Sequence, residues 1–324
     1  MTARRILILR TDRLGETVLT LPVIATLKRA HPQAAITLLV SEPLAALVRE
    51  GPGVDEVLTL PARQPRGWIR RAMRLAHLLR PYQFDCAIVS NPKKELHLAV
   101  WLAGIRWRVG YDRKWRWLLT HRIPDDKTQG DRHEVEYTMD LIRCFGATSP
   151  TPSWALPTIH PEADSVRAML QDQGVPPARL VVVHPWTSHP QKQWPVASFQ
   201  QLLQRLVDQP SLRVALIGGR EEAPMAIPLV AAVPKVINWV GQLSLRHVAE
   251  VLRQATVLIS NDSGPVHLAA AVGCHVIALF GTTVSAQGPR RWGPWGEGHT
   301  VIWKSQVADI TVDDVMTAAG SYLQ

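Results

Sequence analysis

Residues 257–271 read Val-Leu-Ile-Ser-Asn-Asp-Ser-Gly-Pro-Val-His-Leu-Ala-Ala-Ala, an apolar run that ends in polar and glycine residues before an alanine-rich segment. The composition predicts a buried strand followed by a helix. A helix N-terminus offers N–H groups and the positive end of its dipole, so this turn predicts an anion site. Gly264 lets a ligand approach the backbone, and Ser263 adds a hydroxyl donor. The same residues also suit simple capping of the helix by Asp262 or Ser263.

Similar apolar runs alternate with helix-period segments along the rest of the chain. Strand–helix alternation of this kind predicts an α/β protein with parallel sheets, whose ligands bind beyond the carboxyl ends of the strands. We expect an amphipathic helix over Gly67–Arg80 and a closing helix over Val312–Leu323, which can pack on either half of the chain. The expected strands are Ile6–Arg10, Ile36–Val40, Val57–Leu60, Ala87–Ser90, Leu180–His184, Val214–Gly218, Val236–Trp239, Val257–Ser260 and Val276–Phe280.

The length of 324 residues exceeds that of one ordinary domain and suits two. Pro150, Pro152 and Pro157 crowd a linker-like stretch near the middle of the chain. We therefore expect one Rossmann-like domain over residues 1–157 and a second over residues 158–324, with their sheets facing each other across a cleft.

The composition excludes several classes of protein. Hydrophobic residues make up 46% and charged residues 19%, which indicates a folded globular protein rather than a disordered one. No apolar run approaches the ~20 residues of a membrane-spanning helix, and the first apolar run is too short for a signal peptide. We expect the protein to stay in the cytoplasm. Cys86, Cys144 and Cys274 form no CxxC pair, so neither a disulfide framework nor a zinc site is indicated.

The net positive charge of the protein comes entirely from the first half. Residues 1–157 hold 24 Lys and Arg against 15 Asp and Glu, whereas residues 158–324 hold 12 against 12. Residues 63–132 alone carry 16 against 6, interleaved with five tryptophans. Such a patch attracts an anionic membrane surface, an acidic glycolipid or nucleic acid, or it simply keeps the protein soluble. Nucleic acid is not expected, because no helix-turn-helix, zinc-finger or RNA-stacking signature is present.

Two further turns follow expected strands. The first, Arg10-Thr-Asp-Arg-Leu-Gly-Glu-Thr, has a single glycine and therefore lacks both the dinucleotide fingerprint and the P-loop. Its Glu16 either faces a ligand or only favours the helix dipole. The second turn runs from His184 to Pro195, which suits the first turn of a helix. Lys192 in this loop can neutralise a leaving phosphate or can be an ordinary surface lysine.

Together the three turns resemble those of glycosyltransferase family 9, which includes the ADP-heptose:lipopolysaccharide heptosyltransferases. The matching segments are Ile-Leu-Arg-Thr-Asp-Arg-Leu-Gly-Glu-Thr-Val-Leu-Thr-Leu-Pro-Val, Lys-Gln-Trp-Pro, and Asn-Asp-Ser-Gly-Pro-Val-His-Leu-Ala-Ala-Ala with the later Leu-Phe-Gly-Thr-Thr. The resemblance implies a GT-B fold in which the first domain binds the acceptor and the second the nucleotide-sugar. It also implies inversion of the anomeric centre without a metal or a cofactor.

The resemblance assigns roles to individual residues. Glu16 stands where family members usually have a catalytic aspartate, which keeps the carboxylate on a longer arm, and Asp12 is the nearby substitute. Lys192 is assigned to diphosphate stabilisation and Asp262 to the donor sugar, and these two are expected to be catalytic together with Glu16. The expected donor-binding residues are Thr187, Ser188, Lys192, Glu222 (or Glu221), Gly241, Gln242, Asp262, Ser263, Gly264 and His267. The expected acceptor-binding residues are Asp12, Arg13, Arg70, Arg71, Arg74, Lys93 and Lys94.

The implied reaction moves a heptose, or a similar sugar, from an ADP-sugar to the anionic inner core of lipopolysaccharide. The basic half would hold this acceptor at the cytoplasmic face of the inner membrane. Two other interpretations stay open at this point. One is a nucleotide-sugar epimerase of the same fold, which needs no second sugar. The other is a noncatalytic binder of anionic glycolipid, in which the change from aspartate to Glu16 marks lost activity.

Overall fold

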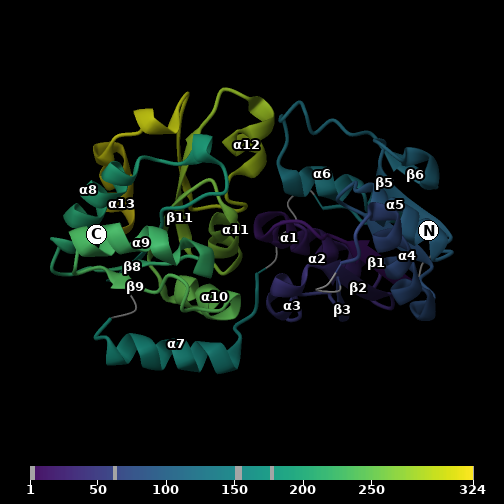
Figure 1. Cartoon of the computed structure of the whole chain (residues 1–324), viewed down its shortest axis with the longest axis horizontal. Coiled ribbons are helices and arrows are strands. Elements are labelled where there is room, and N and C mark those ends of the chain that lie inside the picture. The colour runs from purple at the N-terminus through teal and green to yellow at the C-terminus, as the bar shows by residue number, and fades with distance from the viewer. Residues whose placement is uncertain (1–3, 61–63, 150–154, 176–178, 324) are drawn as a thin grey trace. The chain divides into compact units, whose positions relative to one another are not determined.

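The computed structural model describes residues 4–60, 64–149, 155–175 and 179–323, and the chain divides into two compact units, Met1–Trp154 and Ala155–Gln324 (Figure 1). Pro150 and Pro152 of the expected linker lie outside the described residues. Leu156 and Pro157 belong to the second unit because their carbonyls accept hydrogen bonds from Arg253 Nη2 at 2.7 and 3.2 Å. The Leu156 amide also donates to the Ala271 carbonyl at 2.9 Å. The boundary therefore lies about three residues before the expected one.

The first unit is built on a six-stranded parallel sheet in the order β3-β2-β1-β4-β5-β6. Its central strands are apolar on both faces, as expected for a sheet that is covered on both sides. The strands are β1 (Arg5–Leu9), β2 (Ala35–Val40), β3 (Glu56–Thr59), β4 (Cys86–Val89), β5 (Trp107–Tyr111) and β6 (His121–Ile123).

Amphipathic helices cover this sheet. In α4, Ala72, Leu75, Ala76 and Leu79 form the buried stripe, which packs against β1, β4 and the neighbouring helix α5 in one hydrophobic core. The helices are α1 (Leu14–Val18), α2 (Leu21–Ala30), α3 (Glu42–Val48), α4 (Trp68–Leu79), α5 (Lys94–Leu102) and α6 (Glu134–Asp140). Short 3₁₀ turns are η1 (Arg80–Tyr82), η2 (Arg116–Leu118) and η3 (Arg143–Phe145).

The second unit repeats this topology with a six-stranded parallel sheet in the order β12-β11-β10-β7-β8-β9. The strands are β7 (Leu180–His184), β8 (Arg213–Leu216), β9 (Ile237–Asn238), β10 (Val257–Asn261), β11 (His275–Gly281) and β12 (Thr300–Lys304). The helices are α7 (His160–Asp172), α8 (Val196–Val207), α9 (Ala223–Ala232), α10 (Leu245–Gln254), α11 (Gly264–Ala271), α12 (Pro289–Trp292) and α13 (Val312–Leu323). The 3₁₀ turns are η5 (Pro190–Lys192), η6 (Arg220–Glu222), η7 (Ser285–Gln287) and η8 (Val307–Asp309).

The closing helix α13 packs within the second unit. Its Val315 and Ala319 are fully buried in the core formed by β7, β8 and α8. The sequence left open which half of the chain the closing helix packs on. The structure shows that the buried stripe of α13 packs in the core of the second unit.

The nine expected strands are all present within one or two residues, but three further strands were not predicted. These are β5, β6 and β12, which lie at or next to the edges of the two sheets. Edge strands are only partly buried, and β12 alternates between half-buried and exposed residues. Their sequences therefore lack the continuous apolar run that reveals a central strand.

Both sheets reverse their strand order at an equivalent place. The first strand of each unit, β1 or β7, lies between the second and fourth strands of that unit, with β1 next to β4 and β7 next to β10. In open α/β sheets, ligands bind beyond the carboxyl ends of the strands at such a point. None of the helices in the described ranges is long and apolar enough to cross a membrane.

Candidate active site

In the second unit, polar side chains gather where β7 and β10 end. His184 and Ser260 are register partners at these ends, and both are buried. His184 Nδ1 lies 3.3 Å from Ser260 Oγ and 3.2 Å from Ser263 Oγ, and the two hydroxyls are 2.9 Å apart. Ser263 is the N-cap residue of α11, but its hydroxyl makes no cap hydrogen bond to the helix. Side-chain capping by Ser263 is therefore wrong as an explanation, and the N-terminus of α11 stays a candidate anion site.

The loop that carries Lys192 is held at both ends by one buried side chain. Asn261 donates through Nδ2 to the Pro185 carbonyl at 2.6 Å and accepts from the Trp194 amide at 3.0 Å. Trp194 is fully buried, stacks edge-on against Phe199, and donates through Nε1 to the Ile310 carbonyl at 2.8 Å. The loop is therefore anchored in the core on either side of Lys192. Pro195 is the N-cap of α8 rather than a residue of its first turn.

Lys192 and Asp262 form an ion pair through Nζ and Oδ2, although 70 residues separate them in the chain. Their side chains are 24% and 10% exposed, so the pair lies at the surface of the site rather than in the core. Burial raises the pKa of Asp262, and the nearby Lys192 cation opposes this shift. The arrangement places a cation beside the N-terminus of α11, where each would stabilise a phosphate.

The remaining expected donor residues, apart from His267 in α11, lie on the segments that follow the strands β7, β8 and β9. The Thr187 hydroxyl donates to the Asp262 carbonyl at 3.3 Å, which ties the Lys192 loop to the start of α11. Ser188 is exposed, and His267 is buried within α11. Gln242 turns back on its own loop, where Nε2 donates to the Asn238 carbonyl at 2.7 Å.

Glu222 has a structural contact that the sequence did not reveal. Its Oε2 accepts from the Gly219 amide at 2.6 Å and lies 3.6 Å from His184 Nε2. Although burial opposes it, contact with His184 and the Gly219 amide lowers the pKa of Glu222. An added Cβ at Gly218 would lie 2.7 Å from Glu222 Oε2, so this carboxylate is packed tightly beneath the turn. Gly241 is adjacent, since its amide donates to the Gly218 carbonyl at 2.9 Å.

In the first unit, a buried arginine, Arg10, lies at the centre of the charges on the corresponding edge. Arg10 follows β1 and is 2% exposed. Its Nε lies 3.0 Å from Asp12 Oδ1, its Nη2 lies 3.5 Å from Glu134 Oε1, and its Nη1 donates to the Ser90 carbonyl at 3.4 Å. Glu134 is also buried and accepts from Lys127 Nζ at 2.6 Å. Burial opposes the charged state of Arg10, but the two carboxylates overcome this and raise its pKa.

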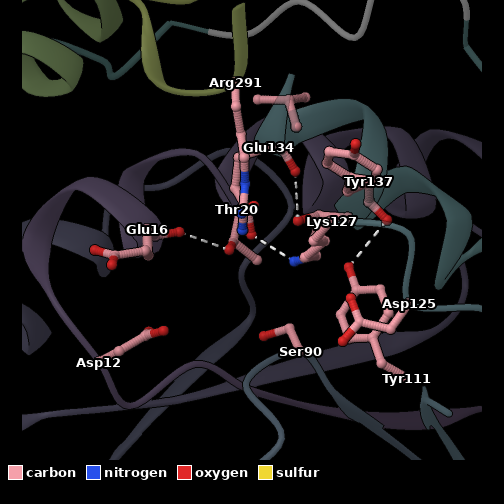
Figure 2. A network of polar contacts seen from close by, with 12 residues as sticks. Asp12, Glu16, Thr20, Ser90, Tyr111, Asp125, Lys127, Glu134, Tyr137 and Arg291 are labelled. Carbon is pink, nitrogen blue, oxygen red and sulfur yellow. Dashed lines mark hydrogen bonds and ion pairs between the residues drawn. The ribbon is translucent and has the colours of Figure 1, made fainter. Parts of the chain in front are cut away.

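Lys127 connects this network to the tyrosines beside it. Its Nζ lies 4.2 Å from the centre of the Tyr111 ring, and the Tyr111 hydroxyl donates to the Tyr137 carbonyl at 3.0 Å, as Figure 2 shows. Arg10, Lys127 and Glu134 therefore form one charged cluster at the edge of the sheet.

Glu16 lies in the short helix α1, next to this cluster. Its backbone carbonyl accepts from the Thr20 hydroxyl at 2.8 Å, which fixes the helix rather than the carboxylate (Figure 2). Burial raises the pKa of Glu16, and the Asp12 carboxylate adds to this, whereas Arg10 and Arg13 lower it. A carboxylate with a raised pKa is a stronger base, which suits removal of a proton from a sugar hydroxyl. Asp12 is already paired with Arg10, so Glu16 is the better candidate of the two.

A pocket of about 160 Å³ lies at the same edge of the first unit. It brings together Arg71, Arg74 and Lys93 of the expected acceptor residues, and Lys93 Nζ also donates to the Thr11 carbonyl at 3.4 Å. Arg70 and Lys94 do not line it. The lining residues are Thr11, Leu60, Gln64, Arg71, Arg74, Leu75, Lys93, Glu95 and Leu96. The pocket is therefore basic with one carboxylate, and that carboxylate, Glu95, is 3.7 Å from Arg71.

Residues 72–318 match the sequence profile of glycosyltransferase family 9 (heptosyltransferase), which covers more than half of the chain. The chain belongs to glycosyltransferase family 9. It is a heptosyltransferase-like glycosyltransferase, and the family expected from the three turns is confirmed.

Individual members of the family match over nearly the whole chain. Lipopolysaccharide heptosyltransferase 3 of Escherichia coli is 24% identical over 321 residues, which cover 95% of this chain and 92% of that protein. The family 9 glycosyl transferase structure from Veillonella parvula aligns with a TM-score of 0.88 at 21% identity, over 99% of this chain and 97% of that one. The E. coli heptosyltransferase WaaC with ADP-2-deoxy-2-fluoro heptose aligns with a TM-score of 0.75 at 22% identity, over 98% and 99%. These structural matches confirm the expected α/β fold of the GT-B class.

Proposed function

We propose that this glycosyltransferase moves a heptose from ADP-heptose to an anionic sugar of the lipopolysaccharide inner core, with inversion at the anomeric carbon. The observation that carries the proposal is the Lys192–Asp262 pair beside the N-terminus of α11, in a chain of family 9. The solved relative bound to an ADP-heptose analogue supports the choice of donor, and the relative named lipopolysaccharide heptosyltransferase 3 supports the choice of acceptor.

In the proposed reaction, the second unit binds the donor. The diphosphate lies against the N–H groups at the start of α11, where Lys192 Nζ reaches it. Negative charge on the diphosphate grows as ADP leaves, so both groups stabilise the transition state more than the bound donor. Asp262 holds Lys192 in place before the donor arrives, and its carboxylate can accept a hydrogen bond from a sugar hydroxyl. Because two fixed positive groups meet the leaving phosphate, the proposed transfer requires no metal ion.

The first unit supplies the acceptor and the base. The pocket lined by Arg71, Arg74 and Lys93 binds a phosphate or acid sugar of the acceptor through charge-assisted hydrogen bonds. Glu16 then takes the proton of the acceptor hydroxyl as that oxygen attacks the anomeric carbon. One bond forms between the acceptor oxygen and the anomeric carbon, and the bond from that carbon to the diphosphate breaks. ADP leaves with the electron pair, and Glu16 carries the proton.

Thermal stabilisation by a panel of nucleotide-sugars tests the donor. A ligand that binds only the folded state stabilises it and so raises the melting temperature. At a ligand concentration a hundred times its Kd, the free energy of unfolding increases by about 2.7 kcal/mol. We expect ADP-heptose to stabilise the protein more than UDP- or GDP-sugars do. Incubation of ADP-heptose with a lipopolysaccharide acceptor that lacks the heptose should then yield ADP and a heptosylated product of inverted configuration. Equal stabilisation by all sugars, or conversion of the donor without an acceptor, would overturn the proposal.

A further inference from the structure

Large apolar side chains are exposed together on α4, α5 and η2 of the first unit. Ile69 and Met73 on α4 are 50% and 58% exposed, Trp101 on α5 is 48% exposed, and Trp117 on η2 is 64% exposed. Single exposed apolar residues are common on protein surfaces, but a group of four on adjoining elements is not. These four residues are called the outer apolar patch below.

Aromatic contacts join the elements that carry the patch. The rings of Trp68 and Trp115 are 5.0 Å apart, and those of Trp115 and Trp117 are 5.6 Å apart. Lys94 Nζ lies 4.6 Å from the centre of the Trp68 ring, which connects the start of α4 to the start of α5. The helices α4 and α5 also pack side by side (Figure 1). The ring contacts therefore connect Trp117 to the start of α4, the helix that carries Ile69 and Met73, and α5, which packs beside α4, carries Trp101.

The backbone at Trp115 supports a functional role for this surface. Trp115 has φ = +68°, in the left-handed region that a bulky side chain rarely adopts. Such a conformation costs free energy of its own and is kept where the surroundings require it. Here it starts the turn η2, in which Leu118 is buried and Trp117 is largely exposed.

Positive charge surrounds the outer apolar patch. Helix α4 carries three arginines and no acidic residue. Arg66 and Arg70 lie within three residues of Ile69 in the chain, Lys94 contacts the ring of Trp68, and all three are exposed. Exposed tryptophans among lysines and arginines are typical of surfaces that rest in the interface of an anionic bilayer. Each basic residue near such a surface contributes about 1 kcal/mol to binding.

Helix α4 connects this surface to the acceptor pocket. Arg71, Arg74 and Leu75 line the pocket, whereas Ile69 and Met73 lie one turn apart on the outer side and do not line it. If the proposed function is right, the acceptor sugar carries a lipid that stays in the bilayer. One helix would then contact the bilayer with one side and the sugar of the same acceptor with the other.

We propose that the outer apolar patch, with Arg66, Arg70 and Lys94, docks the protein on an anionic lipid bilayer. The tryptophans and the α4 side chains enter the interface, and the basic residues contact the lipid phosphates. The choice of a glycolipid as acceptor rests on the proposed function, but the docking itself needs neither donor nor acceptor.

Co-sedimentation of the full chain with vesicles tests this proposal without either substrate. One set of vesicles is pure phosphatidylcholine, and the other is an equimolar mixture with phosphatidylglycerol. We expect binding to the mixed vesicles that weakens as salt rises, and little binding to the neutral ones. Trp117→Ser and Ile69→Ser should each weaken binding about tenfold, because each removes a large apolar side chain from the interface. Arg70→Ala should weaken it about fivefold.

Matched variants in the second unit serve as controls. Ile227→Ser removes a side chain of α9 that is 67% exposed, and Arg167→Ala removes an exposed charge of α7. Both should bind the mixed vesicles like the unaltered protein. Met73→Ser provides a second patch variant should Ile69→Ser or Trp117→Ser unfold, and the melting temperature of each variant in ADP reports whether it is folded.

Three results would overturn the docking proposal. The first is equal binding to neutral and mixed vesicles, or none to either. The second is equal weakening by patch and control variants. The third is that the patch variants abolish self-association of the protein in solution. Tighter binding of single-stranded RNA than of the mixed vesicles, if the patch variants abolish it, would count in the same way. Donor stabilisation and transfer to a soluble, delipidated acceptor are measured separately. Loss of transfer with intact vesicle binding would count against the proposed function alone.

Discussion

The two units share a strand order but use the equivalent edge of the sheet in different ways. Beyond β7 and β10, Lys192 and Asp262 form a partly exposed ion pair next to the start of α11. Beyond β1 and β4, the charges lie deeper, where the buried Arg10 contacts Asp12 and Glu134. The edge beyond β7 and β10 therefore carries its cation at the surface, whereas the edge beyond β1 and β4 keeps its central cation buried and carries the half-buried carboxylate of Glu16. In the proposed reaction, one topology thus provides the anion site in one unit and the base in the other.

The largest effect is expected from removal of the proposed base, Glu16. Glu16→Gln keeps the size of the side chain but cannot accept the proton, so turnover should fall about a thousandfold. Donor binding belongs to the other unit, and the Kd for ADP should stay unchanged. Steady-state transfer and ADP titration measure the two quantities.

Glu42→Gln, at the first turn of α3, is the matched control because Glu42 is exposed and also lies at a helix start. It should transfer at the normal rate. Normal turnover of Glu16→Gln would show that Glu16 is not the base, and Asp12→Asn would then be the next variant.

Removal of the cation from the second edge should have the next largest effect. Lys192→Ala should lower kcat by several hundredfold, because a positioned positive group no longer meets the charge on the leaving diphosphate. ADP should also bind more weakly, in contrast to Glu16→Gln. The exposed Lys235 provides the control Lys235→Ala, for which we expect neither effect. If Lys192→Ala leaves both kcat and ADP affinity intact, the leaving group is stabilised elsewhere.

Glu134→Gln tests whether the charge cluster of the first unit is structural. Glu134 is buried between Arg10 and Lys127, and loss of its charge leaves both cations without that partner. Removing one member of a buried pair costs about 3 kcal/mol or more, so the urea midpoint should fall clearly. Asp164→Asn removes one partner of the exposed pair with Arg167 and should cost less than about 1 kcal/mol. If both variants lower the urea midpoint equally, the buried charge cluster contributes no more to stability than an exposed ion pair does.

The pH dependence of transfer should show the smallest effect. Burial raises the pKa of Glu16, and the base acts only when it is deprotonated. As pH falls through this raised pKa, kcat/KM should decline. This decline, called the acid limb, should begin at a higher pH than it would for a carboxylate with an ordinary pKa. The Lys192→Ala variant should keep the acid limb, whereas the residual rate of Glu16→Gln should lack it. An acid limb that persists in Glu16→Gln belongs to another group.

The same raised pKa has a consequence for stability. A carboxyl group whose pKa is higher in the folded state than in the unfolded state weakens folding at any pH above the folded pKa. That cost disappears as pH falls below the unfolded pKa, where both states are neutral. Glu16→Gln should therefore raise the melting temperature at neutral pH, and the difference should shrink on acidification. A constant difference across this range would contradict the assignment of the raised pKa.

Much of the second edge could be predicted from the sequence, and less of the first. Lys192 and Asp262 are far apart in the chain, but each follows an apolar strand, and neighbouring parallel strands end at the same edge. The Arg10–Glu134 contact had no such signal. Glu134 follows β6, a three-residue strand at the sheet edge whose sequence His-Arg-Ile does not look like a strand. Without β5 and β6, the path that returns the chain to Arg10 could not be traced.

Polar residues at the ends of apolar strands also mark the site. His184 ends the otherwise apolar strand β7, and Ser260 and Asn261 end β10. A polar residue in such a place needs a partner, so all three could have been assigned to the site before the structure was known. The partner of each could not be predicted, because it depends on how the intervening loops fold back.

The side-chain amide of Asn261 makes hydrogen bonds to both ends of the loop from Pro185 to Trp194. A segment fastened in this way has little freedom to adjust when a different nucleotide-sugar is offered. Attempts to change the donor preference by substitution should therefore begin at the turns after β8 and β9, around Gly219 and Gln242. Within the loop from Pro185 to Trp194, a change of donor preference would first require the loss of one of the two hydrogen bonds of Asn261.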